Sequence, residues 1–304
     1  MVQGSILKPI PLVSVLMNCY NGEKYLKEAI ESVLAQSYQN WEIIFWDNQS
    51  TDRSAEIFKS YNDPRLKYHF APSHTMLYEA RNYALDKASG EFIAFLDVDD
   101  WWLPNKLEKQ IPLFSDPDVG MVCGNYWIVS ERKNKRWKSL KRPAPTGWVL
   151  NDLLEFYFVG LLTLVVRRSA LTSLDYPCDP RYHMIGDLDL VVRLATQWKL
   201  ACEQEPVGFY RAHDSNASLK QRSRHLGELE RWLEAMNGVE AIRSCQNFQL
   251  LKQHSIYQQA VYRLLQSDRL GAYRLIRDLP WGHFKVKLWL AQLLPGFVVR
   301  RLKN

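Results

Sequence analysis

The sequence lacks the features of a secreted or membrane-spanning protein. Its five cysteines are odd in number, lie far apart and form no Cys-x-x-Cys pair, which argues against a disulfide framework and a zinc site. The first residues lack a positive start followed by a long apolar run, so we expect no signal peptide. No apolar run reaches the roughly 18 residues that a membrane span requires. We therefore expect a cytoplasmic protein.

The sequence also lacks repeats, low-complexity tracts and a strong excess of one charge. A net charge of +6 permits an anionic partner without identifying one, and we expect no nucleic acid among the partners. A chain of 304 residues can bury a large core, which favours one large α/β domain with an appendage over two equal domains.

What the first hundred residues contain is an alternation of apolar strands and amphipathic helices. Strands are predicted at residues 11–17, 41–46, 66–70 and 92–96, with helices between them. This order indicates an α/β fold with a Rossmann-like, mostly parallel sheet flanked by helices. The last of these strands, FIAFL, is apolar at every position, which is typical of a strand buried on both faces.

Three carboxylates follow that strand: Asp97, Asp99 and Asp100. Ligands of open α/β sheets bind beyond the carboxyl ends of the strands. Neighbouring acids repel each other unless a cation or several donors compensate them, and carboxylate oxygens suit Mg²⁺ or Mn²⁺. We therefore predict a divalent metal ion here. The alternative is a turn whose Asp caps the helix that opens near Pro104.

Polar residues follow two other strands. Asp47 could accept hydrogen bonds from the imide of a base or from a ribose hydroxyl, or it could cap the next helix. The Tyr20-Asn21 turn follows the first strand, and Asn21 can cap the helix after it.

Asp187 precedes a helix that is apolar nearly all round, through residues 188–195. Such a helix must be buried, and the helix dipole favours the charged form of an acid at its amino end. This placement suits a general base, although an ordinary Asp N-cap would show the same pattern.

Two segments, VSVLMNCYNGEKYLKEAIESVLAQSYQNWEIIFWDNQSTD and EARNYALDKASGEFIAFLDVDDWW, resemble the nucleotide-sugar-binding half of the inverting family 2 glycosyltransferases. The resemblance extends over about the first 220 residues and implies a GT-A-type fold with a DxD metal motif. The chain departs from the family at Asn18-Cys19, where Pro-Thr is usual, and at Asp47-Asn48-Gln49, where Asp-Asp-Gly is usual. These positions line the nucleotide end.

The resemblance also implies roles for single residues. The segment around Asp187 is similar to the family's Glu-Asp motif, whose Asp is the catalytic base, with Gly186 in place of the Glu. Arg211-Ala212-His213 is similar to the Arg-x-His element, whose donors would offset charge on a departing diphosphate. The residues implied in nucleotide-sugar binding are Tyr20, Asn21, Asp47, Arg81, Asp97, Arg211 and His213, and those implied in metal binding are Asp97, Asp99 and His213.

The predicted domains follow from the residues and the resemblance together. Residues 1–220 form the catalytic domain, in which residues 11–130 bind the nucleotide sugar and residues 131–220 carry the acceptor side and the base. Residues 221–304 form a C-terminal helical extension. The implied reaction transfers a sugar, with inversion and a divalent metal, from a nucleoside-diphosphate sugar to a hydroxyl of a saccharide or lipid-linked saccharide. The implied setting is cell-surface polysaccharide or glycolipid synthesis.

Two alternative functions stay open at this point. A sugar nucleotidyltransferase would also use paired acids and a metal, but it usually has a Gly-rich basic loop after the first strand, and NCYNGEKYL is a poor version of one. A nucleotide-sugar or glycan-binding module without turnover has no reason to keep a buried acid such as Asp187 facing the donor.

The last 24 residues, 281–304, form a basic tail without an acid; its cations are Lys285, Lys287, Arg300, Arg301 and Lys303. Basic and aromatic residues flank a short apolar run that Pro295-Gly296 interrupts. This pattern favours a segment that lies on an anionic bilayer, peripheral to the inner face of the membrane. The alternative is a helix that packs on the main domain with an exposed basic face.

Overall fold

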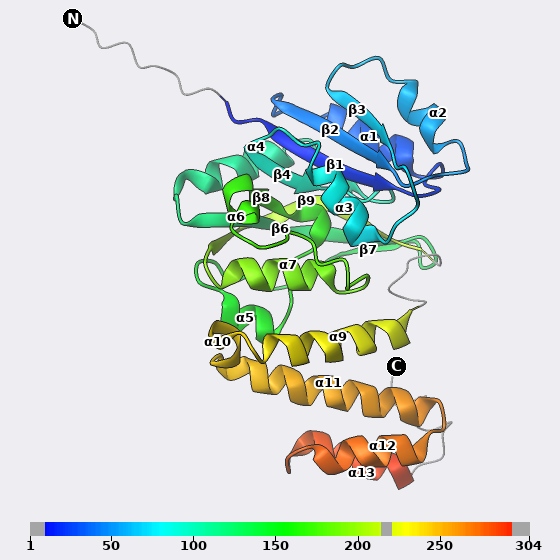
Figure 1. The fold of residues 1–304 in the computed structure, drawn as a ribbon, viewed down its shortest axis with the longest axis vertical. Coiled ribbons are helices and arrows are strands. Elements are labelled where there is room, and N and C mark those ends of the chain that lie inside the picture. Colours follow the sequence, from blue (N-terminus) through cyan, green and yellow to red (C-terminus); the bar gives the residue numbers. More distant parts are fainter. Residues whose placement is uncertain (1–9, 214–220, 294–304) are drawn as a thin grey trace, which may run out of the picture. The chain divides into compact units, whose positions relative to one another are not determined.

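The computed structural model describes residues 10–213 and 221–293. Two compact units divide them: residues 10–149 and 158–213 belong to the first, and residues 150–157 and 221–293 belong to the second. Figure 1 shows a sheet with flanking helices in the first unit and helices alone in the second.

The first unit is built on one mixed sheet. The four strands predicted in the first hundred residues pair in parallel: β1 (Val13–Cys19), β2 (Trp41–Asp47), β3 (Leu66–Phe70) and β4 (Phe92–Phe95). The remaining strands are β5 (Trp101–Trp102), β6 (Val119–Ser130), β7 (Lys135–Lys138), β8 (Val165–Arg167) and β9 (Lys199–Ala212). The strand order is β3-β2-β1-β4-β8-β6-β9-β5, and β7 pairs with β6.

Every residue of β1 is buried because helices cover both faces of the sheet. On one face, Val13, Val15 and Met17 pack in the same core as α1 (Leu26–Leu34). On the other face, α3 (Leu77–Leu85) packs on β1 and β2 (Figure 1). The further helices of this unit are α2 (Ser54–Lys59), α4 (Lys106–Gln110), η1 (Ile111–Ser115), η2 (Leu161–Thr163), α6 (Arg168–Thr172) and α7 (Gly186–Ala195).

The two-residue strand β5 brings the acidic turn beside the end of β9. Trp101 pairs with Phe209 and Trp102 with Gly208 in an antiparallel ladder. The rings of Trp101 and Phe209 stack with their centroids 4.8 Å apart. Residues that lie far apart in the sequence, 97–100 and 211–213, thus become neighbours.

The second unit contains α5 (Leu150–Glu155), α9 (Arg222–Met236), α10 (Glu240–Arg243), α11 (Gln246–Leu265), α12 (Arg269–Asp278) and α13 (His283–Leu293). The predicted C-terminal helices are thus present. Unlike in the predicted division, α5 belongs with them, because the backbone N–H of Asn247 on α11 donates to the Asn151 side chain at 3.0 Å. Among the residues described, no helix combines the length and apolarity needed to span a membrane.

Candidate active site

The acidic turn lies beyond the carboxyl end of β4, next to β1. The chain proceeds from β1 outward through β2 and β3 and returns to β4 on the other side of β1. This is the switch point at which open α/β sheets bind their ligands.

Each acid of the turn has a different donor. Asp97 accepts a hydrogen bond from Arg81 at 2.6 Å, and Asp99 Oδ2 lies 3.0 Å from His213 Nε2. Asp100 accepts from the backbone N–H of Arg211 at 2.9 Å. The turn therefore has the compensating donors that the sequence required, and no acid in it caps α4, whose N-cap is Asn105.

The turn still disfavours negative charge. Burial, and then the charge of Asp97, raises the pKa of Asp99 against the opposing hydrogen bond with His213. Burial and the charges of both other acids raise the pKa of Asp100 well above its usual value. A cation at this turn would relieve that repulsion.

Asp99 and His213 could hold part of a divalent metal site. Among the residues described, no three His, Cys, Asp or Glu side chains gather closely enough to bind an ion by themselves. Mg²⁺ commonly binds through one or two protein groups, and phosphate and water complete its shell. Asp99 and His213 fit that pattern, and the Asp97 side chain beside them is 40% exposed.

Arg211 positions the acidic turn through hydrogen bonds and ring contacts. Its guanidinium lies between the rings of Tyr25 and Trp101, 4.4 and 4.3 Å from their centroids. Its Nε donates to the Asp99 carbonyl at 3.0 Å, and the same guanidinium pairs with Glu28. Arg211 is thus engaged in positioning contacts, and its predicted contact with the diphosphate stays a prediction.

Arg81 lies beneath Asp97 and is almost fully buried. Burial opposes its charge, but the Asp97 carboxylate, with smaller contributions from Tyr78 and Cys178, outweighs burial and raises the pKa of Arg81 overall. Its guanidinium also lies 4.5 Å from the centroid of the Tyr78 ring. Arg81 therefore supports Asp97, and its predicted contact with the nucleotide stays a prediction.

Asp187 is the second residue of α7, whose N-cap is Ile185. The alternative that Asp187 is the N-cap is therefore wrong. After burial, the charge of Asp187 is the next cause that raises the pKa of Tyr78, on which Asp97 also acts. The charges of Asp187 and Asp97 thus both act on Tyr78, whose ring centroid lies 4.5 Å from the Arg81 guanidinium.

Gly186 makes room for Tyr78. A Cβ atom on Gly186 would lie 2.6 Å from three atoms of the Tyr78 ring, closer than packed atoms approach. The absence of the family's Glu at this position thus has a steric reason. Sequence reasoning missed Tyr78, although its spacing of three residues from Arg81 places both on one face of α3.

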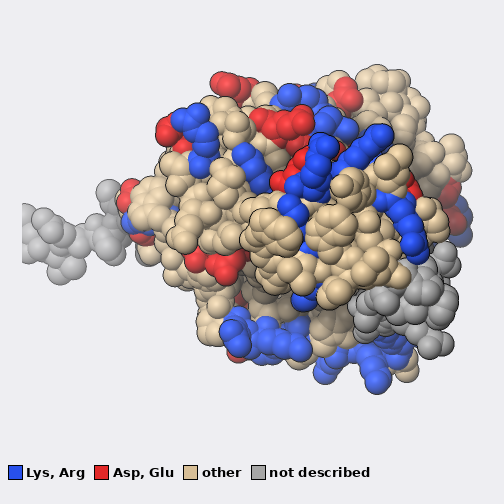
Figure 2. Space-filling view, turned by 90° about the horizontal axis from the view of Figure 1, so that it is seen from below, with Lys and Arg blue, Asp and Glu red and all other residues tan. Residues whose placement is uncertain are grey.

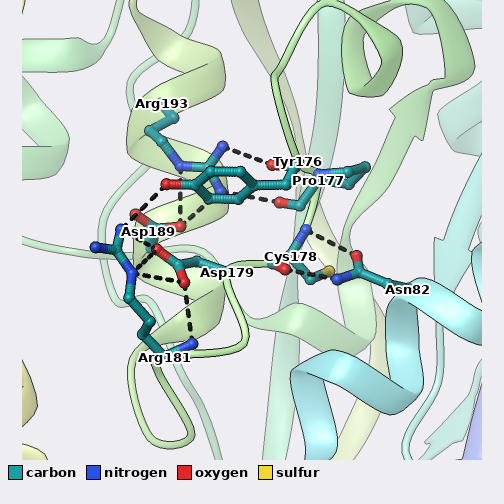
Figure 3. A network of polar contacts seen from close by, with 8 residues as sticks. All are labelled: Asn82, Tyr176, Pro177, Cys178, Asp179, Arg181, Asp189 and Arg193. Atoms are coloured by element: carbon teal, nitrogen blue, oxygen red, sulfur yellow. Dashed lines mark hydrogen bonds and ion pairs between the residues drawn. The ribbon is translucent and has the colours of Figure 1, made fainter.

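The loop before α7 is fastened to α3, as Figure 3 shows. The side-chain amide of Asn82 donates to the Cys178 carbonyl at 2.7 Å, and the Cys178 N–H donates back to it at 3.0 Å. This reciprocal pair fixes the chain that leads into α7.

Arg193 ties the same loop to α7 itself (Figure 3). It donates to the carbonyls of Tyr176 and Pro177 at 2.9 Å each, and it pairs with the buried Asp189 at 2.6 Å. The loop at residues 176–178 is therefore hydrogen-bonded both to α3 and to α7, whose first turn carries Asp187 and Asp189.

At the nucleoside end, Asp47 is fully buried. Its two oxygens accept from the backbone N–H of Ser50 and from the Tyr68 hydroxyl, each at 2.7 Å. It does not cap α2, whose N-cap is Arg53. The predicted contact of Asp47 with a base or ribose stays a prediction.

Tyr20 and Asn21 follow β1. Asn21 does not cap α1, whose N-cap is Tyr25, so that prediction is wrong. It adopts a left-handed backbone with φ of 54°, and its side chain accepts from the Thr51 N–H at 2.8 Å. Asn21 thus joins the turns after β1 and β2. Tyr20 is 55% exposed beside it.

These features define a GT-A-type domain. The structure resembles S. aureus TarS in complex with UDP-GlcNAc (TM-score 0.65, 17% identity, covering 88% of this chain and 81% of that one). It also resembles the Pyrobaculum calidifontis mannosyltransferase PcManGT in complex with GDP-Man and Mn²⁺ (TM-score 0.60, 16% identity, covering 97% and 87%). At these identities the likeness shows the fold, and the predicted fold class is confirmed.

Residues 14–171 match the model of Glycosyl transferase family 2, and the chain belongs to that family. An Escherichia coli relative is named UDP-Glc:alpha-D-GlcNAc-diphosphoundecaprenol beta-1,3-glucosyltransferase WfgD. It is 37% identical over 166 residues, which are 55% of this chain and 64% of the relative. The match thus covers slightly less than two thirds of WfgD. The family resemblance seen in the sequence is confirmed.

Proposed function

We propose that this chain transfers a sugar from a nucleoside-diphosphate sugar to an acceptor hydroxyl with inversion and with the help of Mg²⁺ or Mn²⁺. The observation that supports this most is the 3.0 Å approach of His213 to Asp99 at the carboxyl end of the parallel strands. Asp187 influences Tyr78, which borders the same turn. A metal-binding pair and a base candidate are the parts that such a transfer requires.

The donor and the metal have support from the structural neighbours. TarS has been solved with UDP and with UDP-GlcNAc, and PcManGT with GDP-Man and Mn²⁺. We propose that Asp99 and His213, with Asp97 beside them, hold the ion in this chain. When bound, the ion would draw negative charge onto the leaving diphosphate.

The protein's own groups perform the other steps. Asp187 accepts the proton of the acceptor hydroxyl as that oxygen attacks the anomeric carbon, so that a single displacement inverts the configuration. The Arg211 guanidinium and the His213 imidazole offset charge on the diphosphate. Arg81 positions the Asp97 carboxylate through a 2.6 Å hydrogen bond, and the Tyr20-Asn21 turn seats the nucleoside at the end of the sheet that also carries the buried Asp47. No covalent enzyme intermediate is required.

The acceptor is proposed to be a saccharide on a lipid diphosphate. The name of WfgD specifies GlcNAc linked to diphosphoundecaprenol. An acceptor of this kind is anchored in a membrane, so an enzyme that uses it gains from association with the bilayer surface.

The C-terminal unit supports such association. Trp281 is 82% exposed and Leu293 79% exposed, at the two ends of the α13 region. Figure 2, which views the molecule from the side of α12 and α13 in Figure 1, shows an area of uncharged surface with Lys and Arg side chains around it and some Asp and Glu side chains among them. We propose that this face contacts anionic lipid. Of the predicted cations, Lys285 donates to the Leu279 carbonyl at 2.6 Å, and Arg300, Arg301 and Lys303 lie outside the described residues.

The experiment for the transfer reaction is a screen of UDP- and GDP-sugars with a lipid-linked GlcNAc acceptor, with release of the nucleoside diphosphate as the readout. We expect turnover with Mn²⁺ and loss of turnover with excess chelator. Equal turnover in both conditions would contradict the metal, and binding without turnover for every pair would favour the binding-module alternative.

The membrane proposal has a separate test. Full-length protein should sediment with vesicles that contain phosphatidylglycerol, and added salt should weaken this binding because it screens the basic face. The variant Trp281→Ser/Leu290→Ser should bind at least about tenfold more weakly, since two exposed apolar side chains are lost. Equal sedimentation of the two proteins would contradict the proposed face.

A further inference from the structure

The loop after β3 is fastened to the nucleoside end of the site. The side-chain amide of Asn48 donates to the Thr75 carbonyl at 2.8 Å, and its oxygen accepts from the Thr75 N–H at 3.2 Å. The side-chain amide of Gln49 donates to the Pro72 carbonyl at 3.0 Å. Residues 71–76 therefore form a fixed wall beside the turn that follows β2.

Gln49 replaces the glycine that is usual in the family and adopts the conformation that glycine favours. Its φ is 67°, in the left-handed region that non-glycine residues seldom occupy. With this backbone conformation, the Gln49 side chain donates its hydrogen bond to the Pro72 carbonyl in the loop after β3. Strained positions of this kind tend to occur at ligand sites.

The loop places His74 against Tyr20. The two ring centroids lie 4.4 Å apart, and both side chains are exposed to solvent. An exposed aromatic ring beside a second flat ring offers a surface on which a base can stack.

A hydrogen bond fixes the tautomer of the His74 ring. Its Nδ1 lies 2.9 Å from the Asn48 carbonyl oxygen, which can only accept, so Nδ1 carries the proton. The longer 3.4 Å approach of the Asn48 amide nitrogen to Nδ1 is the weaker contact. In the neutral ring, Nε2 is therefore a hydrogen-bond acceptor on an exposed side chain.

Asp47, the other candidate acceptor for a base, is less accessible than His74 Nε2. Both Asp47 oxygens already accept hydrogen bonds, from Ser50 and from Tyr68, and the side chain is fully buried. A base that arrives at the Tyr20 surface thus finds an accessible acceptor in His74 before it reaches Asp47.

We propose that His74 selects the base of the nucleotide donor, with Nε2 accepting the ring N–H that lies beside a carbonyl: N3–H of uracil or N1–H of guanine. Tyr20 supplies the stacking surface. Cytosine and adenine carry a lone pair on the corresponding ring nitrogen and would face Nε2 with two acceptors. This inference rests on the proposed function, since it concerns the donor of that reaction.

Calorimetric titration of the full chain in Mn²⁺ with UDP, CDP, GDP and ADP tests the proposal. The wild-type protein should bind UDP more tightly than CDP, or GDP more tightly than ADP, by about tenfold, and the two pairs show which base fits the loop. His74→Phe keeps a ring beside Tyr20 but has no acceptor. It should weaken binding of the preferred nucleotide about fivefold and leave binding of the other nucleotide in that pair unchanged. His74→Gln can place a carbonyl near the Nε2 position and should retain most of the preference.

Two outcomes would overturn the proposal in different ways. An unchanged preference in His74→Phe, with the protein still folded, would remove His74 as the selecting residue and leave the proposed function intact. Failure of the wild-type protein to bind any of the four nucleotides would contradict the proposed function, and this inference with it.

Discussion

Two parallel strands of the mixed sheet, β2 and β4, lead into acids that have different surroundings. Asp47 at the end of β2 is fully buried and accepts from neutral donors. Asp97 and Asp99 beyond β4 are 40% and 30% exposed at their side chains and face Arg81 and His213. A strand's carboxyl end thus brings an acid to the ligand side of the sheet, but the donors around it decide whether the acid serves the fold or the site.

The difference follows from the neighbouring strands. β2 lies between β1 and β3, so Tyr68 of β3 reaches the Asp47 side chain. β4 is followed by the turn into β5, whose pairing with β9 places Arg211 and His213 next to the acids. Asp47 is fully buried with a donor on each oxygen, whereas Asp97 and Asp99 are partly exposed, so a metal ion can reach their remaining lone pairs.

The largest expected effect is at Asp187, which lies on a helix rather than at the end of a strand. Asp187→Asn should lower transfer by about a hundredfold or more, because the amide cannot accept the proton, while nucleotide affinity changes little. The melting temperature should fall only slightly, since asparagine keeps the shape of the side chain in the first turn of α7 and only its charge is lost.

Asp189 offers the matched control for that experiment, two residues further along α7. Its side chain is buried and paired with Arg193 at 2.6 Å, so Asp189→Asn should lower the melting temperature. A fully active Asp187→Asn enzyme would remove the base assignment and return the binding-module alternative.

The second prediction concerns Asp99. Asp99→Ala should weaken Mn²⁺-dependent binding of a nucleoside diphosphate by about a hundredfold, because the turn then lacks a carboxylate for the ion. Asp116→Ala is a control at an exposed carboxylate that pairs with Lys199 at 3.1 Å on the surface, and it should bind normally. Titration with and without chelator measures both variants. Wild-type affinity in Asp99→Ala would contradict the metal assignment.

The third prediction tests the other half of the comparison. Asp47→Ala leaves the Ser50 N–H and the Tyr68 hydroxyl without their buried acceptor and should cost about 2–3 kcal/mol of unfolding free energy. Tyr68→Phe removes one of these bonds and should cost about 1 kcal/mol. Urea denaturation gives both values. A stable Asp47→Ala protein with much weaker nucleotide binding would show that Asp47 belongs to the site.

The parts of the fold that depend on local pattern could be predicted from the sequence. The apolar strands at the centre of the sheet and the buried helix α7 appear where their periodicity places them. The acids at 97–100 were recognisable because like charges at a strand end require compensation. The roles of Asp97, Asp99, His213 and Asp187 in catalysis remain predictions that the variants above address.

The parts that depend on distant partners could not be predicted. Strand β5 has two residues and exists only through β9. The caps proposed at Asn21 and Asp187 were wrong because backbone conformation, which composition does not reveal, decides where a helix begins. The contacts of Tyr78 with Gly186 and of His74 with Asn48 join segments that no local pattern connects.

Among the acids compared here, the smallest effect is expected at Glu42, near the opposite end of the same sheet. Burial raises the pKa of this carboxyl, but hydrogen bonds from Lys67, Ser14 and Ser89 outweigh burial and lower the pKa to about 2. An unfolded glutamate titrates near pH 4.3. Because the folded pKa is the lower one, the stabilising contribution is complete above that value and is lost as the pH falls toward 2.

Glu42→Gln should therefore be less stable than the wild-type protein by about 2 kcal/mol at pH 6, and the gap should shrink steadily between about pH 4.5 and pH 2. Glu31→Gln is the control: its carboxylate pairs with Lys27 at 3.7 Å on the surface, and its loss should change stability little. Denaturation curves at several pH values give the gap directly. A constant gap from pH 6 to pH 3 would mean that Glu42 acts through packing rather than charge.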